Sequence, residues 1–320
     1  MNRLLIKSHS GALFAALLLS AVVTFSPSAT AQVYDPVTLQ PLGAYQDTRE
    51  AQQLAYASST TQIDTAHWYT GGDKFSCSLS QDIKRLGTAT FTERAGGGTD
   101  FILHTQRNPL AAGQLMLVAQ APVWAPELTP RTLGPVQVVR GKQAVQVDNH
   151  MANAMLASLQ RGMAPEFQGA AWFDTQQTVD VGMSPKHFLK AYDKFLACSE
   201  QLFSKNFEQI SRSRVHFDTD KHNVNVEARA LLDEIVEYSK VDKTVKRFYI
   251  DGHTDNVHDR YYNIDLSKRR ARAVAAYLTS AGISKKRITT RYHGERYPVV
   301  ANTSDANRLK NRRVTVRLER

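Results

Sequence analysis

An acidic and a basic side chain in the C-terminal third of the sequence have the types and the spacing to hold a small charged group. Asp255 lies in the run G-H-T-D-N, and Arg270 follows fifteen residues later in the run N-I-D-L-S-K-R-R-A. We predict that Asp255 ends a strand and that Arg270 lies on the following helix, so that folding brings the two together. Charge-assisted hydrogen bonds of fixed geometry are strong, and arginine can hold a carboxylate through two parallel bonds. The pair could therefore face a zwitterion, with Asp255 taking an ammonium and Arg270 a carboxylate, or it could form an internal salt bridge without a ligand.

The predicted helix around Arg270 gives a further reason to expect an anion nearby. Arg270 comes one position before the apolar stripe Ala271, Val274, Ala275 and Leu278, which places it at the edge of the buried face. Asp265 or Asn263 could cap the start of this helix, where free backbone N–H groups favour an anion. A ligand carboxylate is therefore favoured for two independent reasons.

The polar residues around this pair resemble the OmpA-like peptidoglycan-binding family. The family pattern G-H-T-D, N-x-x-L-S-x-x-R-A, G-x-x-x-P and R-x-x-N-R-R-V is matched by residues 252–255, 263–271, 294–298 and 308–314. The resemblance implies that Asp255 and Arg270 are the main contacts to the diaminopimelate of a peptidoglycan stem peptide, with Asn263 assisting. It also implies that Thr219 and Asp220 could line the same pocket.

Two positions depart from the family pattern. His258 stands where many members have glycine, three residues after the aspartate, and Asp220 stands where asparagine is common. The family pattern therefore does not predict the conformation of the loop after Asp255 or the role of Asp220.

Metal and catalytic motifs are weak in this sequence. His253, Asp255 and His258 have neither a matching fourth group nor the usual ligand spacing of a metal site. The motifs G-x-S-x-G and H-E-x-x-H and a phosphate loop are missing from the sequence. We therefore expect no metal, no cofactor and no enzymatic activity.

Basic charge is concentrated in the C-terminal part of the chain. Residues 212–320 contain 24 Lys and Arg against 14 Asp and Glu, and the formal charge of this part equals the +10 of the whole chain. A basic domain suits an anionic polymer, and in an exported protein the carboxylates of peptidoglycan are a better candidate than nucleic acid. A basic surface that serves only solubility is the alternative.

The N-terminal 31 residues have the pattern of a secretory signal. Arg3 and Lys7 precede an apolar stretch, and Ala29, Thr30 and Ala31 are small residues at the expected cleavage point. The mature chain should begin near residue 32, and no later stretch has the length of about 20 apolar residues that a membrane-spanning helix needs. We predict an exported, periplasmic protein without a membrane span.

Cys77 and Cys198 are the only cysteines, and both lie in the mature part. Oxidation to a disulfide is the default for an even number of cysteines in an exported protein. The chain-entropy model gives a loop of this length roughly 5 kcal/mol of stabilisation. Two separate buried thiols are the alternative.

Residues 32–211 are predicted to form a β-rich domain with supporting helices. Residues 96–98, three glycines, indicate a hairpin between two strands. One helix is predicted over residues 149–160, and a second is predicted to start at Ser184 and Pro185. The strand-like runs are residues 75–79, 88–94, 100–105, 114–120, 136–140 and 144–147.

Residues 212–320 are predicted to form a second domain, so that the whole chain belongs to the α+β class. Strands near residues 215–217, 247–250, 287–292 and 314–318 alternate with two amphipathic helices. This β-α-β-α-β-β order implies a mixed sheet with its helices on one face.

The order of several residues in the first domain carries a second resemblance. Taken singly, they are typical turn glycines, core aromatics and cysteines. Their joint order resembles the N-terminal domain of the MotY family, periplasmic components of sodium-type flagellar motors. The residues are Cys77, Ile83, Gly87, Ala89, Phe91, Arg94, Ala95, the run A-P-V-W at 121–124, Leu159, Gly162, Pro165, Phe167, Trp172, Tyr192, Phe195, Cys198 and Leu202.

The two resemblances together imply a non-enzymatic anchor for a flagellar motor. The first domain would dock on the basal body and on a MotX-like partner as part of the T ring. The second would fix the assembly to the cell wall, so that the stator complex is held around the rotor. A general envelope tether unrelated to motility is the main alternative, and a cell-wall hydrolase that uses the basic domain for targeting is a third class.

Overall fold

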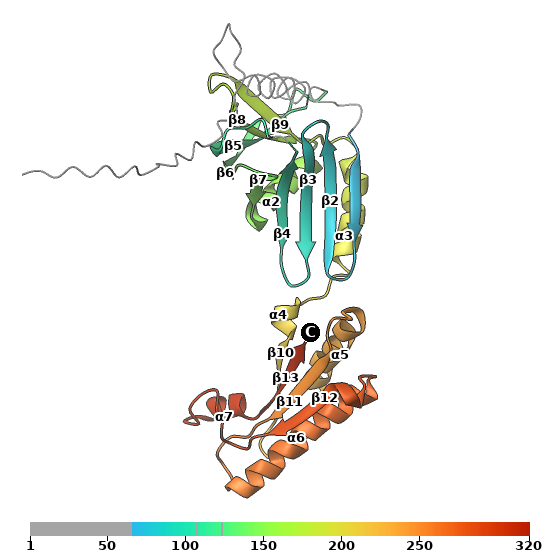
Figure 1. The fold of residues 1–320 in the computed structure, drawn as a ribbon, viewed down its shortest axis with the longest axis vertical. Helices are drawn as coiled ribbons and strands as arrows, with labels where there is room; N and C mark the ends of the chain where they lie inside the picture. Colours follow the sequence, from blue (N-terminus) through green and yellow to red (C-terminus); the bar gives the residue numbers. More distant parts are fainter. Residues whose placement is uncertain (1–65, 107, 123) are drawn as a thin grey trace, which may run out of the picture. The chain divides into compact units, whose positions relative to one another are not determined.

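The computed structural model describes residues 66–106, 108–122 and 124–320, and these contain two separate β-sheets with their own helices (Figure 1). The expected α+β class is confirmed. The predicted signal peptide, residues 1–31, lies outside the described residues. Within the described ranges, no helix has the length and apolarity needed to cross a membrane.

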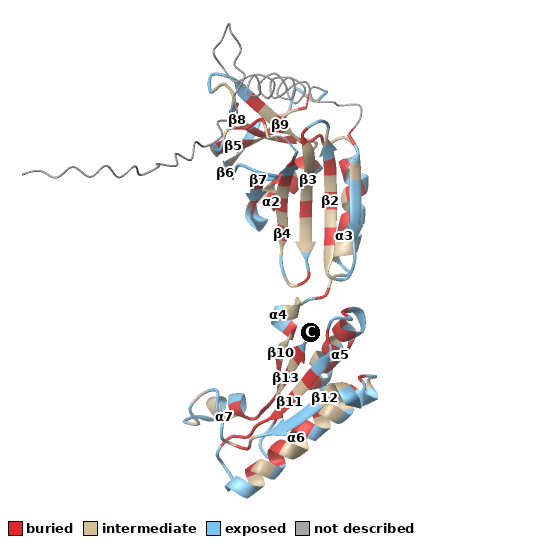
Figure 2. Ribbon diagram, in the orientation of Figure 1, coloured by how far each residue is buried: buried red, intermediate tan, exposed pale blue. Residues whose placement is uncertain are grey.

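The first sheet has nine strands, and every hydrogen-bonded pair in it is antiparallel. Its order is β1-β2-β3-β4-β7-β6-β5-β8-β9. Buried and more exposed residues alternate along β2, β3 and β4 (Figure 2), as expected for a sheet with one covered face. The strands are β1 (Trp68–Gly72), β2 (Ser76–Ile83), β3 (Gly87–Arg94), β4 (Thr99–Thr105), β5 (Gly113–Gln120), β6 (Arg131–Val138), β7 (Gln143–Val147), β8 (Ala164–Ala170) and β9 (Thr178–Gly182).

Two helices cover the apolar face of this sheet. Helix α2 (Asn149–Gln160) packs against β4, β6 and β8, and helix α3 (Phe188–Ser199) packs against β1 and β2. The shared core contains Phe91, Phe101 and Phe167, all without exposed surface. The predicted helix over residues 149–160 is confirmed, and so is the hairpin at residues 96–98.

Helix α3 starts later than the sequence predicts. Its N-cap is His187, with a φ of 61°, rather than Ser184. The backbone N–H of Ser184 donates to Oε1 of Gln81 at 2.9 Å, and its carbonyl accepts from Nε2 of Gln81 at 3.0 Å. Because both backbone groups of Ser184 bond to the side chain of Gln81, Ser184 lies outside the helix and the predicted helix start is wrong.

A disulfide joins Cys77 of β2 to Cys198 near the end of α3. The Cα atoms of the two cysteines are 6.0 Å apart, and Cys77 has no exposed surface. The predicted pairing is confirmed, and it fixes α3 to the sheet that the helix covers.

The second sheet has four strands in the order β10-β13-β11-β12. Strands β11 and β12 are parallel, while β13 is antiparallel to both β10 and β11, so the predicted mixed sheet is confirmed. The strands are β10 (Arg212–His216), β11 (Arg247–Gly252), β12 (Ile288–Tyr292) and β13 (Arg313–Glu319).

Helices α5 (Val226–Val241) and α6 (Arg260–Ser280) pack on one face of this sheet, as predicted. Leu232 of α5 and Val274 of α6 share a core with Ile250 and Val316, which are paired across β11 and β13. The shorter helices are α4 (Phe207–Ile210), the 3-10 helix η2 (Lys285–Arg287) and α7 (Asp305–Asn311).

Candidate functional site

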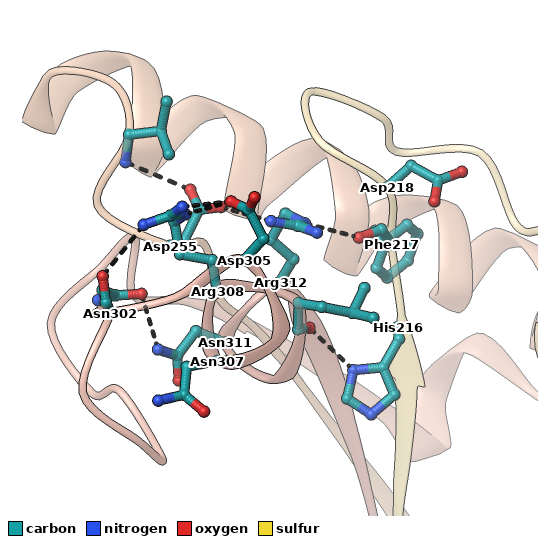
Figure 3. A network of polar contacts seen from close by, with 12 residues as sticks. His216, Phe217, Asp218, Asp255, Asn302, Asp305, Asn307, Arg308, Asn311 and Arg312 are labelled. Atoms are coloured by element: carbon teal, nitrogen blue, oxygen red, sulfur yellow. Dashed lines mark hydrogen bonds and ion pairs between the residues drawn. The ribbon is translucent and has the colours of Figure 1, made fainter.

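Asp255 lies just beyond strand β11 and is almost fully buried, with 4% of its surface exposed. Its Oδ2 accepts a hydrogen bond from Nη1 of Arg312 at 2.9 Å, and its Oδ1 accepts one from the backbone N–H of Val257 at 3.3 Å. Arg312 also donates from Nε to the carbonyl of Phe217 at 3.1 Å (Figure 3). Asp255 is therefore in an internal salt bridge, but its partner is Arg312 rather than Arg270.

Arg270 lies in the middle of helix α6 and has no exposed surface, so its predicted place at the edge of the buried face is wrong. Its guanidinium donates to three backbone carbonyls, those of Lys221 at 2.8 Å, Asp218 at 3.0 Å and His253 at 3.1 Å. These bonds make it possible to bury a charged side chain beside an apolar stripe. A guanidinium has five N–H groups, so two remain for a further acceptor.

The buried charges of Asp255, Arg270 and Arg312 do not cancel. Burial lowers the pKa of Arg270 to about 10, with Asp255 opposing this shift and Arg312 adding to it, so that Arg270 stays cationic at neutral pH. One carboxylate thus faces two guanidinium groups, and the cluster carries one net positive charge. A buried charge without a counter-charge is costly, and a bound carboxylate would offset that cost. The cluster is suited to receive one anionic group.

Asn263 is fully buried inside helix α6 rather than at its start. The helix is capped by Asp259, whose carboxylate accepts from the backbone N–H groups of Tyr261 and Tyr262, so the predicted cap at Asn263 or Asp265 is wrong. The helix starts at Arg260, about three turns before the apolar stripe that begins at Ala271, so its cap comes earlier than predicted. Nδ2 of Asn263 donates to the carbonyl of His258 at 2.8 Å and to Oε2 of Glu295 at 2.6 Å, while its buried Oδ1 has no partner among the described residues.

Thr219 and Asp220 lie on the exposed loop after β10, whose backbone carbonyls bind Arg270. Asp220 has a φ of 58°, in the left-handed region that asparagine and aspartate tolerate better than most residues. Its carboxylate accepts a hydrogen bond from the hydroxyl of Tyr262, and this bond is the main cause of its lowered pKa. Aspartate therefore fits a position where asparagine is common in the family.

His258 also fits the position where glycine is frequent. It is exposed, and its φ is not positive, so the loop does not require glycine here. Its ring lies 4.5 Å from that of Tyr262, measured between centroids, and its carbonyl binds Asn263. Of the two departures from the family pattern, Asp220 has a positive φ and His258 does not.

His253 is a buried residue directly after strand β11. Its pKa is lowered to about 3, mainly by burial and also by the nearby Arg313 and His293, against an opposing effect of Asp251. Its Nδ1 has no partner among the described atoms, and its ring stacks on His293 with centroids 5.0 Å apart. Over the described ranges, no group of three His, Cys, Asp or Glu is placed to hold a metal ion.

Comparison with known families divides the chain into two successive matches. Residues 60–204 match the MotY N-terminal domain, and residues 216–312 match the OmpA family. The chain joins a MotY N-terminal domain to an OmpA-family domain. The two resemblances predicted from the sequence are thereby confirmed.

Relatives of the chain include proteins that share one or both of these domains. The sodium-type flagellar protein MotY of Vibrio parahaemolyticus is 26% identical over 251 residues, which are 76% of this chain and 84% of that protein. The outer-membrane lipoprotein YfiB of Pseudomonas aeruginosa is 34% identical over 116 residues, 36% of this chain and 68% of that protein. The crystal structure of the peptidoglycan-associated lipoprotein from Burkholderia pseudomallei is 28% identical, with a TM-score of 0.32, and covers 33% of this chain and 89% of that chain.

Arg312 is the main residue of the OmpA-family site that the sequence alone did not single out. It belongs to the run N-R-R-V, in which Asn311, Arg312 and Arg313 are all at most 9% exposed. Asn311 fixes the loop before α7, because its Oδ1 accepts from the backbone N–H of Val299 and its Nδ2 donates to the carbonyl of Val300, both at 2.8 Å. Three polar residues in a row at the start of a strand with alternating apolar residues were the signal for this role.

Proposed function

We propose that the protein is a non-enzymatic periplasmic component of a flagellar motor that anchors motor parts to peptidoglycan. The order of the MotY N-terminal and OmpA-family domains supports this proposal, as does the similarity to a sodium-type flagellar MotY over 76% of the chain. We assign residues 1–31 to a signal peptide, 32–211 to basal-body association and 212–320 to wall binding.

The observation that carries wall binding is the buried cluster of Asp255, Arg270 and Arg312 with its net positive charge. The side chain of diaminopimelate ends in an ammonium and a carboxylate on one carbon atom. Two N–H groups of Arg270 remain to bind the carboxylate, and the carboxylate of Asp255 can accept from the ammonium. Arg312 would keep the carboxylate of Asp255 oriented while the ligand binds.

The residues around the cluster would complete the recognition of diaminopimelate. Oδ1 of Asn263 is a buried acceptor without a partner among the described atoms, and an ammonium is the kind of donor that it lacks. Thr219 and Asp220 would flank the ligand from the exposed loop that Arg270 holds in place. Their polar side chains can contact the peptide beyond the charged end.

Sedimentation with purified peptidoglycan tests this site. Asp255→Asn keeps the shape of the side chain but removes its charge. We expect this variant to bind peptidoglycan with about tenfold lower affinity, as for a lost charge-assisted bond, so that a smaller fraction of the protein sediments. Arg270→Ala should reduce sedimentation as well, but it also removes three backbone bonds, so circular dichroism must first show that this variant folds. Unchanged sedimentation of both variants would remove the proposed site.

The MotY N-terminal domain would dock on the basal body and on a MotX-like partner, and so take part in the T ring and in holding the stator complex. Deletion of the gene should then abolish or impair swimming, and the tagged protein should copurify with flagellar basal bodies. Normal swimming of the deletion strain would instead favour a general envelope tether. Release of soluble muropeptides by the purified protein would identify a hydrolase and contradict the anchor.

A further inference from the structure

The sheet of the OmpA-family domain has a second face with a composition unlike that of the first. Helices α5 and α6 pack on the face that carries Ile250 and Val316. Because successive side chains of a strand point to opposite faces, the residues on either side of Ile250 and of Val316 belong to the other face. The register places Arg212 opposite Arg317 and Arg317 opposite Tyr249. We call this surface the arginine face; it consists of Arg212 and Arg214 of β10, Arg317 of β13, Arg247 and Tyr249 of β11, and Arg291 of β12.

Tyr249 lies at the centre of the arginine face and orders the side chains beside it. The guanidinium of Arg317 lies 4.7 Å from the centroid of its ring, and that of Arg291 lies 5.3 Å from it. Stacking on an aromatic ring reduces the rotamer freedom of both arginines before any partner binds. Part of the entropy cost of forming an interface is therefore already met in the free domain.

The charge of this face is positive and only partly compensated. Arg212, Arg214, Arg247 and Arg291 are exposed. Asp251 is 8% exposed and accepts two hydrogen bonds from Arg291, at 2.5 and 2.8 Å. The five arginines thus outnumber the two acidic residues that lie on the same side of the sheet, Asp251 and Glu319. The pair of Asp251 and Arg291 is an example, on this surface, of the two-bond geometry by which arginine holds a carboxylate.

We propose that the arginine face is a docking surface for an acidic segment of another protein. Tyrosine and arginine are among the residue types that contribute most to the binding energy of protein interfaces. Binding to a membrane surface is strengthened by apolar side chains that insert into the bilayer. The exposed large apolar residues of this domain lie off the face, on helices and loops or, like Tyr292, on the opposite side of β12. The composition therefore favours a protein partner over an anionic bilayer.

The size of the face favours an extended segment over a second folded domain. Four strands spaced by about 4.8 Å, with about five residues of 3.3 Å each, cover roughly 15 by 15 Å. The resulting flat area of about 225 Å² is well below the roughly 800 Å² that each partner buries in a standard interface between folded proteins. Arg212 and Arg214 follow each other with the two-residue repeat of a strand, so an extended segment with an acidic residue at every second position matches their spacing.

Fluorescence anisotropy with a labelled ten-residue peptide of alternating Glu and Ser tests this docking surface on the full mature chain. We expect the triple variant Arg212→Gln, Arg214→Gln, Arg317→Gln to raise Kd by about tenfold, because the ion pairs of three arginines with the peptide are lost. The matched control removes three exposed cations away from the face, Lys240→Gln, Lys285→Gln and Lys286→Gln, and should change Kd by less than about twofold.

Three further binding measurements distinguish an acidic protein segment from other partners of the arginine face. A peptide of alternating Gln and Ser should not bind, and equal binding of both peptides would overturn the proposal. Tighter, equally arginine-dependent binding to phosphatidylglycerol vesicles would assign the face to a membrane and overturn it too. The triple variant should still sediment with peptidoglycan; a loss of sedimentation would assign the face to the wall instead.

Discussion

At the level of single residues, the site is organised by a buried ion pair that differs from the expected one. The sequence identifies Asp255 and Arg270, whereas the structure pairs Asp255 with Arg312 and leaves Arg270 bound to three backbone carbonyls. Which arginine meets the carboxylate depends on how the loop after β10 and the segment before β13 come together. Residue type and spacing along the chain do not determine that contact.

Arg312 should matter for stability as well as for binding. Its replacement by glutamine would remove the guanidinium that is directly bonded to the buried carboxylate of Asp255, and breaking a buried ion pair costs about 3 kcal/mol. Urea denaturation of Arg312→Gln measures this loss. The control is Arg269→Gln, which breaks an exposed pair with Asp265 on the same helix and should cost at most about 0.5 kcal/mol. Similar costs for both variants would contradict the assignment of a buried pair.

His253 should make the stability depend on pH in a defined window. Its pKa is about 3 in the folded state, against an ordinary value near 6.5, because burial disfavours the charged ring. Above pH 6.5 both states are neutral here, and as the pH falls towards 3 the unfolded state binds the proton first. This residue therefore lowers the free energy of unfolding by up to about 1.4 kcal/mol per pH unit in that window.

The variant His253→Gln should show a smaller loss of stability between pH 6.5 and pH 4 than the wild type does. The matched control is His104→Gln, since His104 is exposed on β4. Chemical denaturation at a series of pH values gives both slopes. Parallel curves for the wild type and His253→Gln would show that this histidine does not carry the effect.

At the level of elements, the close approach of strand β11 to helix α6 positions the site. A Cβ atom at Gly252 would lie 2.1 Å from the backbone carbonyl oxygen of Ser267, so the helix would have to move to accommodate any side chain. Glycine at this position lets α6 bring Arg270 against the carbonyl of His253. The G-H-T-D run is thus as much a packing motif as a binding motif.

Gly252→Ala should destabilise the protein by about 2 kcal/mol through overpacking, and it should also weaken peptidoglycan sedimentation because Arg270 shifts. Thermal denaturation and sedimentation of the same preparation measure the two effects. Gly71→Ala is the control, because a Cβ there would meet only Oγ of Ser78 at an ordinary 3.5 Å. An unchanged melting temperature for Gly252→Ala would contradict the proposed close approach.

Elements with a strong apolar period are the ones that the sequence predicts best. Helix α2 is predicted at its observed bounds, because Asp148 caps it and Gly162 follows its end. The sequence pattern does not predict strands β1, β8 and β9. For β8 the reason is that the strand contains a proline and a glycine, which argue against a strand. The start of α3 is misplaced because Gln81, more than one hundred residues away, binds the backbone of Ser184. Such long-range contacts leave no local pattern.

At the level of the whole molecule, the disulfide closes a separation of 121 residues within the MotY N-terminal domain. The double variant Cys77→Ser, Cys198→Ser should lose about 2 to 5 kcal/mol of stability, measured by urea denaturation. Reductant should destabilise the wild type to the same extent and leave the double variant unchanged. Thiol titration of the denatured, unreduced protein provides the check, because two free sulfhydryls per chain would disprove the disulfide.

We propose that the buried cluster around Asp255 and Arg270 binds the charged end of diaminopimelate. Lysine is the same residue without the second carboxylate, so walls of the diaminopimelate type and of the lysine type differ in the group that Arg270 would bind. Sedimentation of the mature chain with both wall types tests the claim directly. Because a buried donor without its acceptor is costly, we predict binding to the diaminopimelate wall that is at least about tenfold tighter, with the preference lost in Asp255→Asn. Equal sedimentation of the wild-type protein with both walls would contradict the claim.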